Sequence, residues 1–318
     1  MRFLLAIVLL CCGPVFAQAG YPGKPVRLLV SFPAGGISDV LARALAIPLS
    51  RQLGQQVIVE NKPGAGTTIA GDYMAKQAPD GYTVWLQDIT THAINAALYS
   101  RLPYDSMKDF TYVAMVASTP LMLVVHPNTP AKSVGELIAL LKANPGKYTY
   151  GSSGNGTIVH LAAEMLKSSA GVDALHVPYK GSNPATAAIL GGEVTFVFSS
   201  MPPAVSNVKA GRLRALGVTT PKRVAAAPEV PTMMEAGLRD FEIVLYSGIL
   251  GPKGMERSLV ERLNAEFAKV VQTPEIRNVY EKIGADPIAM TPEAFEKATQ
   301  VEIARLAPIV KASGAKVD

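Results

Sequence analysis

The chain has 318 residues and a formal net charge of +5, spread without any block of five or more basic side chains. That pattern excludes the basic stripe that nucleic-acid binding requires, so we expect no nucleic-acid partner. Both cysteines, Cys11 and Cys12, lie near the N-terminus, and the rest of the chain therefore excludes disulfides, thiolate nucleophiles and cysteine metal ligands. About 300 residues exceed one comfortable core, which predicts two domains.

The first segment has the features of a targeting signal. Arg2 precedes an apolar run, residues 3–10, that is too short to span a bilayer. Small residues then suit cleavage after Ala17 or, better placed, after Ala19. A membrane anchor and a lipoprotein are the alternatives, but the lipoprotein signal lacks the small residue that usually precedes the cysteine. We expect residues 1–19 to be a cleaved signal peptide and the mature protein to be periplasmic.

Strand-like and helix-like segments alternate in the first third of the chain, as in an α/β domain with a largely parallel sheet. The helices are separated from the strands before them by glycine-rich turns, of which Gly35-Gly36 is the first. The predicted segments are strands at 27–31, 57–60 and 82–86, and helices at 38–53 and from the turn at 63–66 to near 78.

The remainder repeats this rhythm and has no low-complexity linker. Capping boxes, Ser133 with Glu136 and Thr232 with Glu235, mark two helix starts. The other predicted segments are strands at 121–125, 148–150, 194–198, 215–219 and 243–250, a helix opened by Thr157, and tail helices near 255–271, 274–283 and 292–311. Because the strand at 243–250 is expected to return to the first domain, we predict one discontinuous domain, 20–121 with 246–318, and an inserted second domain, 122–245.

Two loops share one design, in which a strand runs into glycines and a helix begins directly after them. These loops are Phe32–Ser38 and Gly151–Thr157. Glycines let backbone come close to a ligand, and the free N–H groups and positive dipole of a helix N-terminus attract anions. In open α/β sheets, ligands bind at the carboxyl ends of the strands. Either loop alone could be a structural turn, but two matched loops favour an anion-binding cleft between two domains.

Nucleotide binding is disfavoured by spacing. Where the dinucleotide fingerprint requires a third glycine after Gly154 and Gly156, the chain has Val159, and no Gly-Lys pair precedes Ser or Thr. A serine hydrolase is the enzymatic alternative, because Ser153 lies in a tight turn between a strand and a helix. Its nucleophile elbow would require glycine at position 155, where Asn155 stands.

The four histidines provide little support for catalysis or metal binding. They are His92, His126, His160 and His176, and they include no pair at helical ligand spacing and no marked acidic partner in the sequence. We expect His160 to support the second loop and His126 to be a loop residue. The sequence therefore predicts a binding protein without catalytic residues, metal or cofactor.

The chain resembles the Bug/TctC family of periplasmic solute-binding proteins, receptors linked to tripartite tricarboxylate transporters. The resemblance runs from Tyr21 to nearly the C-terminus and depends on the stretches YPGKPVRLLVSFPAGGISDVLAR, VIVENKPGAGTTIAGDYMAKQAPDGYT, THAINAALYSRLPYD, YGSSGNGTIVHLAAEML, HVPYKGSNPA and AGRLRALGVTT. It implies a two-domain α/β fold of the Venus-flytrap type, with one ligand carboxylate at each loop, the first partly through water.

The resemblance also implies a set of ligand contacts. They are Phe32, Ala34, Gly35, Gly36 and Ser38 in the first loop and Ser152, Ser153, Gly154, Gly156 and Thr157 in the second. Tyr179 and Lys180 follow a later strand and are further candidates for the cleft, with a solvated turn as the alternative. We expect Asp39 to cap its helix instead of touching an anion. Two expected cleft positions depart from the family pattern, Asp88 and Ser199, the latter where many members have aspartate.

These departures bear on the ligand. A buried ammonium must meet a carboxylate or several acceptors, and Ser199 is neutral, so only Asp88 could play that role. Phe32, Tyr179 and Tyr246 offer aromatic walls. We expect a carboxylate without an amine, either a small aliphatic dicarboxylate or an aromatic acid, bound by a monomer that passes it to a transporter. A receptor that signals to a membrane sensor kinase is the alternative.

Overall fold

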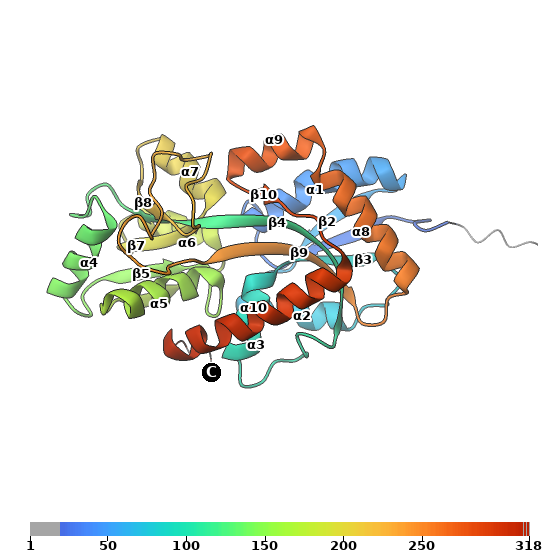
Figure 1. The fold of residues 1–318 in the computed structure, drawn as a ribbon, viewed down its shortest axis with the longest axis horizontal. Helices are drawn as coiled ribbons and strands as arrows, with labels where there is room; N and C mark the ends of the chain where they lie inside the picture. The colour runs from blue at the N-terminus through green and yellow to red at the C-terminus, as the bar shows by residue number, and fades with distance from the viewer. Residues whose placement is uncertain (1–19, 314, 316, 318) are drawn as a thin grey trace, which may run out of the picture.

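The computed structural model describes residues 20–313, 315 and 317, so the predicted signal peptide lies outside the described residues. The molecule is elongated, and a mixed sheet of ten strands runs along its length with helices on both faces (Figure 1). The strand order is β2-β1-β3-β9-β4-β7-β5-β6, and β8 and β10 also pair with β4. None of the helices in the described residues is long and apolar enough to cross a membrane.

The first half of the sheet begins with parallel strands. The strand β1 pairs in parallel with both β2 and β3, and β3 then pairs antiparallel with β9. The elements of the first half are β1 (Val26–Val30), α1 (Ile37–Leu53), β2 (Val57–Asn61), a 3-10 turn (Ala65–Thr67), α2 (Thr68–Ala75), β3 (Thr83–Asp88), α3 (Ile89–Leu98), α8 (Arg257–Val271), α9 (Pro274–Ile283) and β10 (Asp286–Pro287).

The second half repeats the arrangement. The strand β5 pairs in parallel with β6 and β7, whereas β7 and β8 pair antiparallel with β4. Its elements are α4 (Val134–Ala143), β5 (Thr149–Ser152), α5 (Ile158–Ala170), β6 (Leu175–Pro178), α6 (Ser182–Leu190), β7 (Phe196–Ser200), α7 (Met201–Lys209) and β8 (Arg214–Val218).

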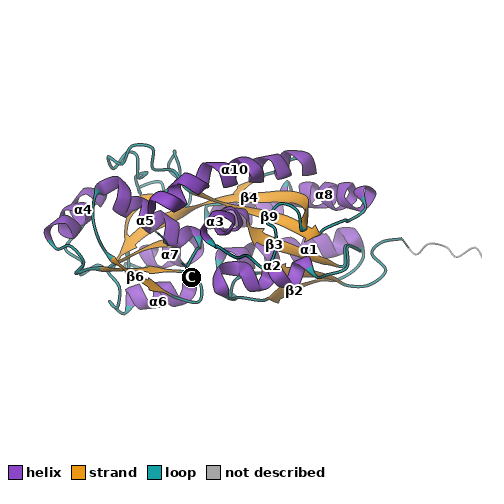
Figure 2. Ribbon diagram, turned by 90° about the horizontal axis from the view of Figure 1, so that it is seen from below, coloured by secondary structure: helices purple, strands orange, loops and turns teal. Residues whose placement is uncertain are grey.

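Two long strands join the halves. β4 (Phe110–Val125) and β9 (Val244–Pro252) pair with each other along the first half, and β4 continues into the second half beside β7 and β8. The helix α10 (Pro292–Ser313) also packs against both halves, on α3 in the first and on α5 in the second (Figure 2). The predicted domain boundaries, 121/122 and 245/246, fall within β4 and β9, and the division itself stays a prediction.

The α/β fold class is confirmed, but the sheet is mostly parallel only in its outer strands. β4 and β9 run antiparallel to every strand beside them, which makes the sheet mixed. The apolar run at 121–125 is only the end of the 16-residue β4. Pro120 argued against a strand before residue 121, because proline cannot donate a hydrogen bond to a neighbouring strand and is rare inside central strands.

Other differences concern helices. The sequence did not predict α3, α6 or α7, which are short and begin directly after strands or glycine turns. The second capping box forms both of its hydrogen bonds, from Thr232 N to Glu235 Oε2 (2.8 Å) and from Glu235 N to Thr232 Oγ1 (3.0 Å). The helix expected after this capping box does not form, and turns stand in its place. Gly237 has a positive φ of 98°, which is not a helical backbone conformation.

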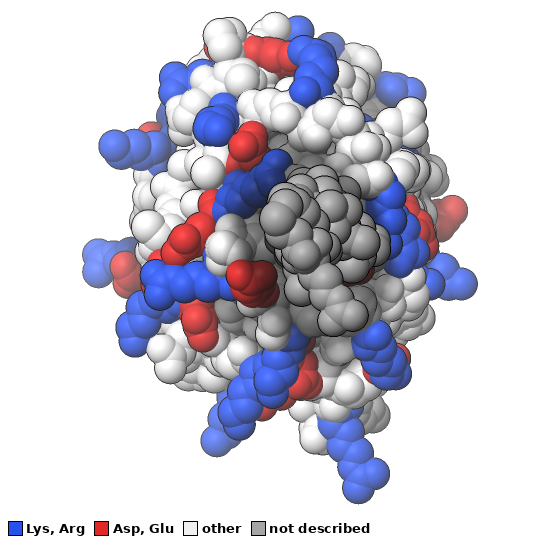
Figure 3. Space-filling view, turned by 90° about the vertical axis from the view of Figure 1, so that its right-hand side faces the viewer, with Lys and Arg blue, Asp and Glu red and all other residues white. Residues whose placement is uncertain are grey.

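The core is continuous across the junction, with a second cluster around Trp85 beneath α3 and α10. Most charged side chains of the described residues lie at the surface, and the buried ones are Asp39, Asp88, Glu164 and Glu302. On the end of the molecule formed by the first half, Lys and Arg side chains are interspersed with Asp and Glu (Figure 3).

Candidate functional site

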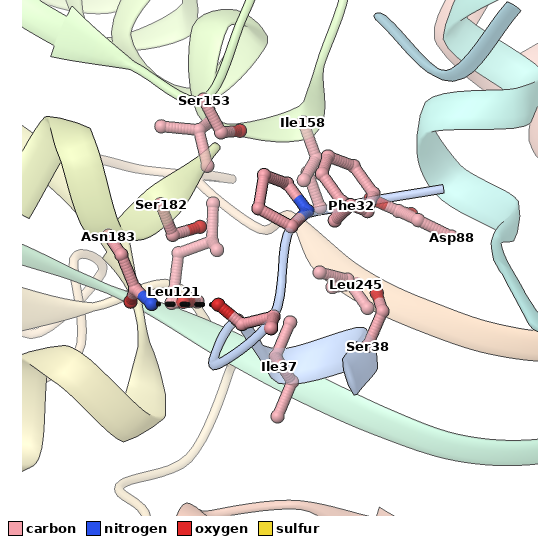
Figure 4. A pocket seen from close by; sticks show the side chains of 15 residues that line it. Phe32, Ile37, Ser38, Asp88, Leu121, Ser153, Ile158, Ser182, Asn183 and Leu245 are labelled. Atoms are coloured by element: carbon pink, nitrogen blue, oxygen red, sulfur yellow. Dashed lines mark hydrogen bonds between the residues drawn. The ribbon is translucent and has the colours of Figure 1, made fainter. Parts of the chain in front are cut away.

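Two hollows lie where the halves meet, and they share Phe32, Pro33 and Ser153 as a common wall. The inner cavity has a volume of about 20 Å³, and the outer groove has about 730 Å³. The inner cavity is lined by residues of both halves: Phe32, Pro33, Ala34, Gly36, Ile37, Ser38, Asp88, Leu121, Ser153, Ile158, Val159, Ser182, Asn183, Ser200 and Leu245 (Figure 4).

Helix N-termini surround the inner cavity. Within the described part of the chain, five helices begin at its wall, namely α1, α3, α5, α6 and α7. Three of them, α1, α6 and α7, have no side-chain cap among the described residues. The first N–H groups of an uncapped helix are free to bind an acceptor, and the helix dipole adds positive potential there. The cavity is therefore suited to an anion without any lysine or arginine in its described lining.

The loop before α1 holds its own shape through Asp39. The Asp39 carboxylate accepts hydrogen bonds from Gly35 N (2.9 Å), Arg43 Nε (2.9 Å) and Asn61 Nδ2 (2.9 Å). Burial raises the pKa of Asp39, but the hydrogen bonds from Arg43, Gly35 and Asn61 outweigh burial and hold the pKa below its usual value. Asp39 thus ties the loop to its helix, and Gly35 N is occupied.

Ser38 contrasts with Asp39. Its side chain is 1% exposed and lines the inner cavity, and its Oγ has no hydrogen-bond partner among the described residues. Gly36 also lines the cavity, with an ordinary extended backbone (φ −76°, ψ 171°). A buried hydroxyl without a partner is unfavourable. The loop before α1 therefore presents open donors to the cavity.

The loop before α5 is internally bonded. Ser152 Oγ lies 2.6 Å from His176 Nε2 and also contacts the backbone N and O of Gly154 (3.1 and 3.2 Å). His176 stacks on His160 with ring centroids 4.0 Å apart. Ser152 is fully buried, so this serine–histidine pair supports the loop from behind and does not face the cavity.

Thr157 caps α5 and completes this network. Its Oγ1 donates to Gly154 O (2.8 Å) and accepts from His160 N (3.5 Å), and Ser153 Oγ donates to it (3.0 Å). His160 Nδ1 accepts from Gly156 N (3.3 Å), which confirms the expected support of the loop by His160. Ser153 thus contacts Thr157, not a histidine, in contrast to a hydrolase nucleophile.

Asp88 is the single charged residue in the described lining of the inner cavity. It caps α3, accepting from Thr91 N (2.9 Å) and Thr91 Oγ1 (2.5 Å). Thr91 Oγ1 in turn accepts from Ile158 N (3.2 Å), which links α3 of the first half to α5 of the second. Burial raises the pKa of Asp88 to about 6, because the charged form loses solvation.

The structure brings together only some of the predicted contacts. Those that line the inner cavity are Phe32, Ala34, Gly36, Ser38, Asp88 and Ser153, and Gly154, Tyr179 and Lys180 join Phe32 and Ser153 in the outer groove. Six line neither hollow: Gly35, Ser152, Gly156, Thr157, Ser199 and Tyr246.

Strand geometry explains two of these positions. Leu245 lines the cavity from β9, so the adjacent Tyr246 points to the other face, where it packs beside the Trp85 cluster. Likewise, Ser200 lines the cavity, whereas Ser199 Oγ contacts Thr186 Oγ1 at 3.3 Å. A shift of one residue along a strand exchanges the face that a side chain meets.

Sequence reasoning missed much of the inner wall. The missed residues are the apolar Pro33, Ile37, Leu121, Ile158, Val159 and Leu245 and the polar Ser182, Asn183 and Ser200. Asn183 Nδ2 donates to Ala34 O (3.1 Å) and so bridges the halves (Figure 4). The Gly-Ser-Asn-Pro run at 181–184, typical of a helix start, was a signal for this contact. No group of three or more possible metal ligands occurs in the described residues.

A mixed α/β sheet in two halves, with helix N-termini enclosing a cavity at the junction, defines a binding protein of the periplasmic type. The family model for the tripartite tricarboxylate transporter family receptor (TctC) matches residues 41–315. The chain belongs to this family, whose members are non-catalytic solute-binding receptors.

Individual relatives agree over nearly full length. Protein BugT of Bordetella pertussis is 36% identical over 305 residues, covering 96% of this chain and 93% of BugT. The structure of Rpa4515 of R. palustris with adipate is 34% identical (TM-score 0.90, covering 93% of this chain and 100% of that one). MatC of Rhodopseudomonas palustris with bound malate is 29% identical (TM-score 0.87, covering 91% and 100%).

Proposed function

We propose that this protein is a periplasmic receptor that binds a small carboxylate in the inner cavity and delivers it to a tripartite tricarboxylate-type transporter. The observation that carries the proposal is the convergence of uncapped helix N-termini on a cavity whose described lining has no lysine or arginine. A carboxylate there accepts backbone hydrogen bonds, each contributing about 1.5–3 kcal/mol. Several of them, less the cost of association, suffice for micromolar affinity.

The first carboxylate binds at the N-terminus of α1, where Gly36 and Ser38 face the cavity. The Ser38 hydroxyl, which has no partner in the described part of the chain, donates to it. The second carboxylate lies toward the N-termini of α6 and α7, near Ser182. In this arrangement the loop before α5 supplies a rigid wall through Ser153 and Ile158.

The ligand has no amine. Asp88 is the one charged group in the described lining, and its carboxylate oxygens already accept two hydrogen bonds as the cap of α3, which makes it a poor partner for an ammonium. Ile37, Leu121 and Leu245 supply an apolar wall, while Tyr246 faces away. An aliphatic dicarboxylate is favoured over an aromatic acid. Relatives bound to adipate and malate support this class.

Binding requires the halves to move. A cavity of about 20 Å³ has room for about one water molecule, which is too little for a dicarboxylate. We infer that residues 20–121 with 246–318 and residues 122–245 act as two domains that open and close on β4 and β9. Contacts such as that of Asn183 with Ala34 then stabilise the closed form that a membrane partner recognises.

Titration calorimetry on ligand-stripped protein tests the proposal, with a panel of C3–C8 dicarboxylates, citrate, benzoate, nicotinate and amino acids. We expect saturable heat near one to one for a dicarboxylate and no turnover. Steady product formation from esters or amides would contradict it. Capture of transporter subunits by the loaded protein supports delivery, whereas capture of a sensor kinase indicates a sensing role. Size-exclusion chromatography checks the proposed monomer.

A further inference from the structure

Four buried hydroxyl groups near the junction have no hydrogen-bond partner among the described residues. They belong to Ser38, Thr119, Ser200 and Ser247, whose side chains are between 0% and 2% exposed. A buried polar group without a partner is unfavourable, and each one requires an explanation. Two of them, Ser38 and Ser200, line the inner cavity directly.

Strand register places Thr119 and Ser200 on the sheet face that borders the cavity, and of the two only Ser200 lines the cavity itself. Thr119 of β4 stands opposite Leu245 of β9, and Ser200 of β7 stands opposite Leu121 of β4. Side chains of directly opposed residues lie on the same face of a sheet. Because Leu121 and Leu245 line the cavity, both hydroxyls belong to that face.

The same register places Ser247 beside Asp88. Ser247 of β9 stands opposite Asp88 of β3, which lines the cavity, and it lies two residues from Leu245 on the same strand face. Asp88, Ser247, Thr119 and Ser200 therefore lie one per strand on β3, β9, β4 and β7, which are neighbours in the sheet. Ser247 opposes Asp88 directly, but Thr119 is diagonal to Ser247, and Ser200 is diagonal to Thr119, with about 7–8 Å for each diagonal step. The four residues thus form a diagonal polar stripe from the first half to the second.

This stripe can both donate and accept hydrogen bonds. Each hydroxyl has one donor and two acceptor positions, and the Asp88 carboxylate keeps acceptor capacity beyond its two bonds from Thr91. A carboxylate only accepts and an ammonium only donates, whereas a ligand hydroxyl does both. The stripe therefore matches an alcohol group better than either ionic group.

We propose that the ligand is a hydroxylated dicarboxylate, whose hydroxyl binds the polar stripe while its carboxylates meet the helix N-termini. This inference rests on the proposed function and narrows its ligand class. A site built to bond a substrate hydroxyl strongly rejects the analogue without it, because the buried groups then stay unpaired.

Three acids with one C4 skeleton test the proposal on the unmodified protein. Succinate has no substituent, malate has a hydroxyl and aspartate has an ammonium at the same carbon. By titration calorimetry we expect malate to bind at least about 10-fold tighter than succinate, and aspartate to bind no better than succinate. Both malate enantiomers are measured, because the stripe is chiral.

Variants connect this preference to the stripe. Ser247→Ala and Ser200→Ala should each reduce the ratio of malate to succinate affinity by at least about 3-fold. The control is Ser106→Ala, which removes another buried serine hydroxyl without a partner among the described residues, but away from both hollows. It should leave the ratio unchanged. Thermal melting verifies that every variant is folded.

The outcomes separate this inference from the proposed function. Equal affinity for succinate and malate would overturn the inference, because the stripe would then bind water and not a ligand hydroxyl. The proposed receptor function would still stand. Tightest binding of aspartate would also overturn it, with Asp88 meeting an ammonium. If no carboxylate binds, the proposed function itself fails. An unchanged ratio in both stripe variants would refute the role of the stripe.

Discussion

The two glycine loops have matching sequence designs but opposite hydrogen-bond states. The loop before α1 has no side-chain cap among the described residues, and Ser38 Oγ is left without a partner there. In the loop before α5, Thr157 caps the helix and Ser152 and Ser153 are both bonded. The first loop can give its donors to a ligand, whereas the second would first have to break its own bonds. We infer that the first loop binds and the second shapes the cavity.

The largest effect is expected from Gly36→Val in the first loop. The extended backbone at Gly36 accepts any residue, and an added Cβ would be no closer than 3.6 Å to Pro33 O. The added side chain would occupy the cavity, so we expect affinity to fall about 100-fold or more, which is about 2.8 kcal/mol. The melting temperature without ligand should change little.

Gly35→Ala is the matched variant for this comparison. Gly35 has a left-handed φ of +82°, and a Cβ there would lie 2.6 Å from Asn183 Nδ2. It should lower the free energy of unfolding by about 1–2 kcal/mol. A Gly36→Val protein that loses stability but keeps its affinity would show that Gly36 serves only the turn.

The second largest effect is expected in the pH dependence of the free energy of unfolding. Burial raises the pKa of Asp88 to about 6, so its neutral form favours folding. Its contribution is complete below about pH 4, its unfolded pKa, and is lost as the pH rises through about 6. We expect wild type to lose up to about 3 kcal/mol relative to Asp88→Asn between pH 3 and pH 8.

Thermal melts of wild type and Asp88→Asn across this pH range measure the difference. Glu302, whose charge also raises the Asp88 pKa, is retained in both proteins, so the difference reports the ionisation of Asp88 together with its coupling to Glu302. A difference that does not vary with pH would show that folding does not shift the pKa of Asp88.

The third prediction compares the loops directly through two serines. Ser38→Ala removes a donor that we assign to the ligand, so affinity should fall about 10-fold or more, while the stability of the free protein holds. Ser152→Ala breaks bonds to His176 and Gly154, so stability should fall by about 1–3 kcal/mol while affinity in the folded fraction changes little. Calorimetry measures the affinity and urea unfolding the stability of each variant. If Ser38→Ala instead lowered stability and Ser152→Ala lowered affinity, the second loop would be the one that binds the ligand.

The smallest effect is expected from Asn183→Ala. It removes one bridge between the halves, the bond to Ala34 O, at an exposed position. A single hydrogen bond of this kind contributes about 0.5–1.5 kcal/mol, so affinity should fall about 3- to 10-fold, mainly through faster release. Asn144→Ala, which removes a bond to Leu140 O within the second half, is the control. Equal effects of both variants on the release rate would argue against a bridging role.

The sequence predicted the fold class and many of the elements, because these follow from local patterns. The tail helix Pro274–Ile283 has the predicted bounds, and α1 differs from its prediction by one residue. The long β4 was not predicted, because Thr119 and Pro120 interrupt its apolar pattern and its pairing with β9 joins residues more than 100 positions apart. Such pairing has no local signature.

For the candidate site, the sequence located both glycine loops and identified the family. The rest depended on the sheet. Whether Ser199 or Ser200, and Leu245 or Tyr246, faces the cavity depends on the register of β7 and β9 against β4, which alternates the faces with every residue. Whether a serine hydroxyl has a hydrogen-bond partner likewise depends on residues distant in the sequence. Ser152 is bonded because the folded chain brings His176 to it, whereas Ser38 has no such partner among the described residues. Local patterns define strands, turns and helix starts, whereas hydrogen-bond satisfaction is a property of the whole packed molecule.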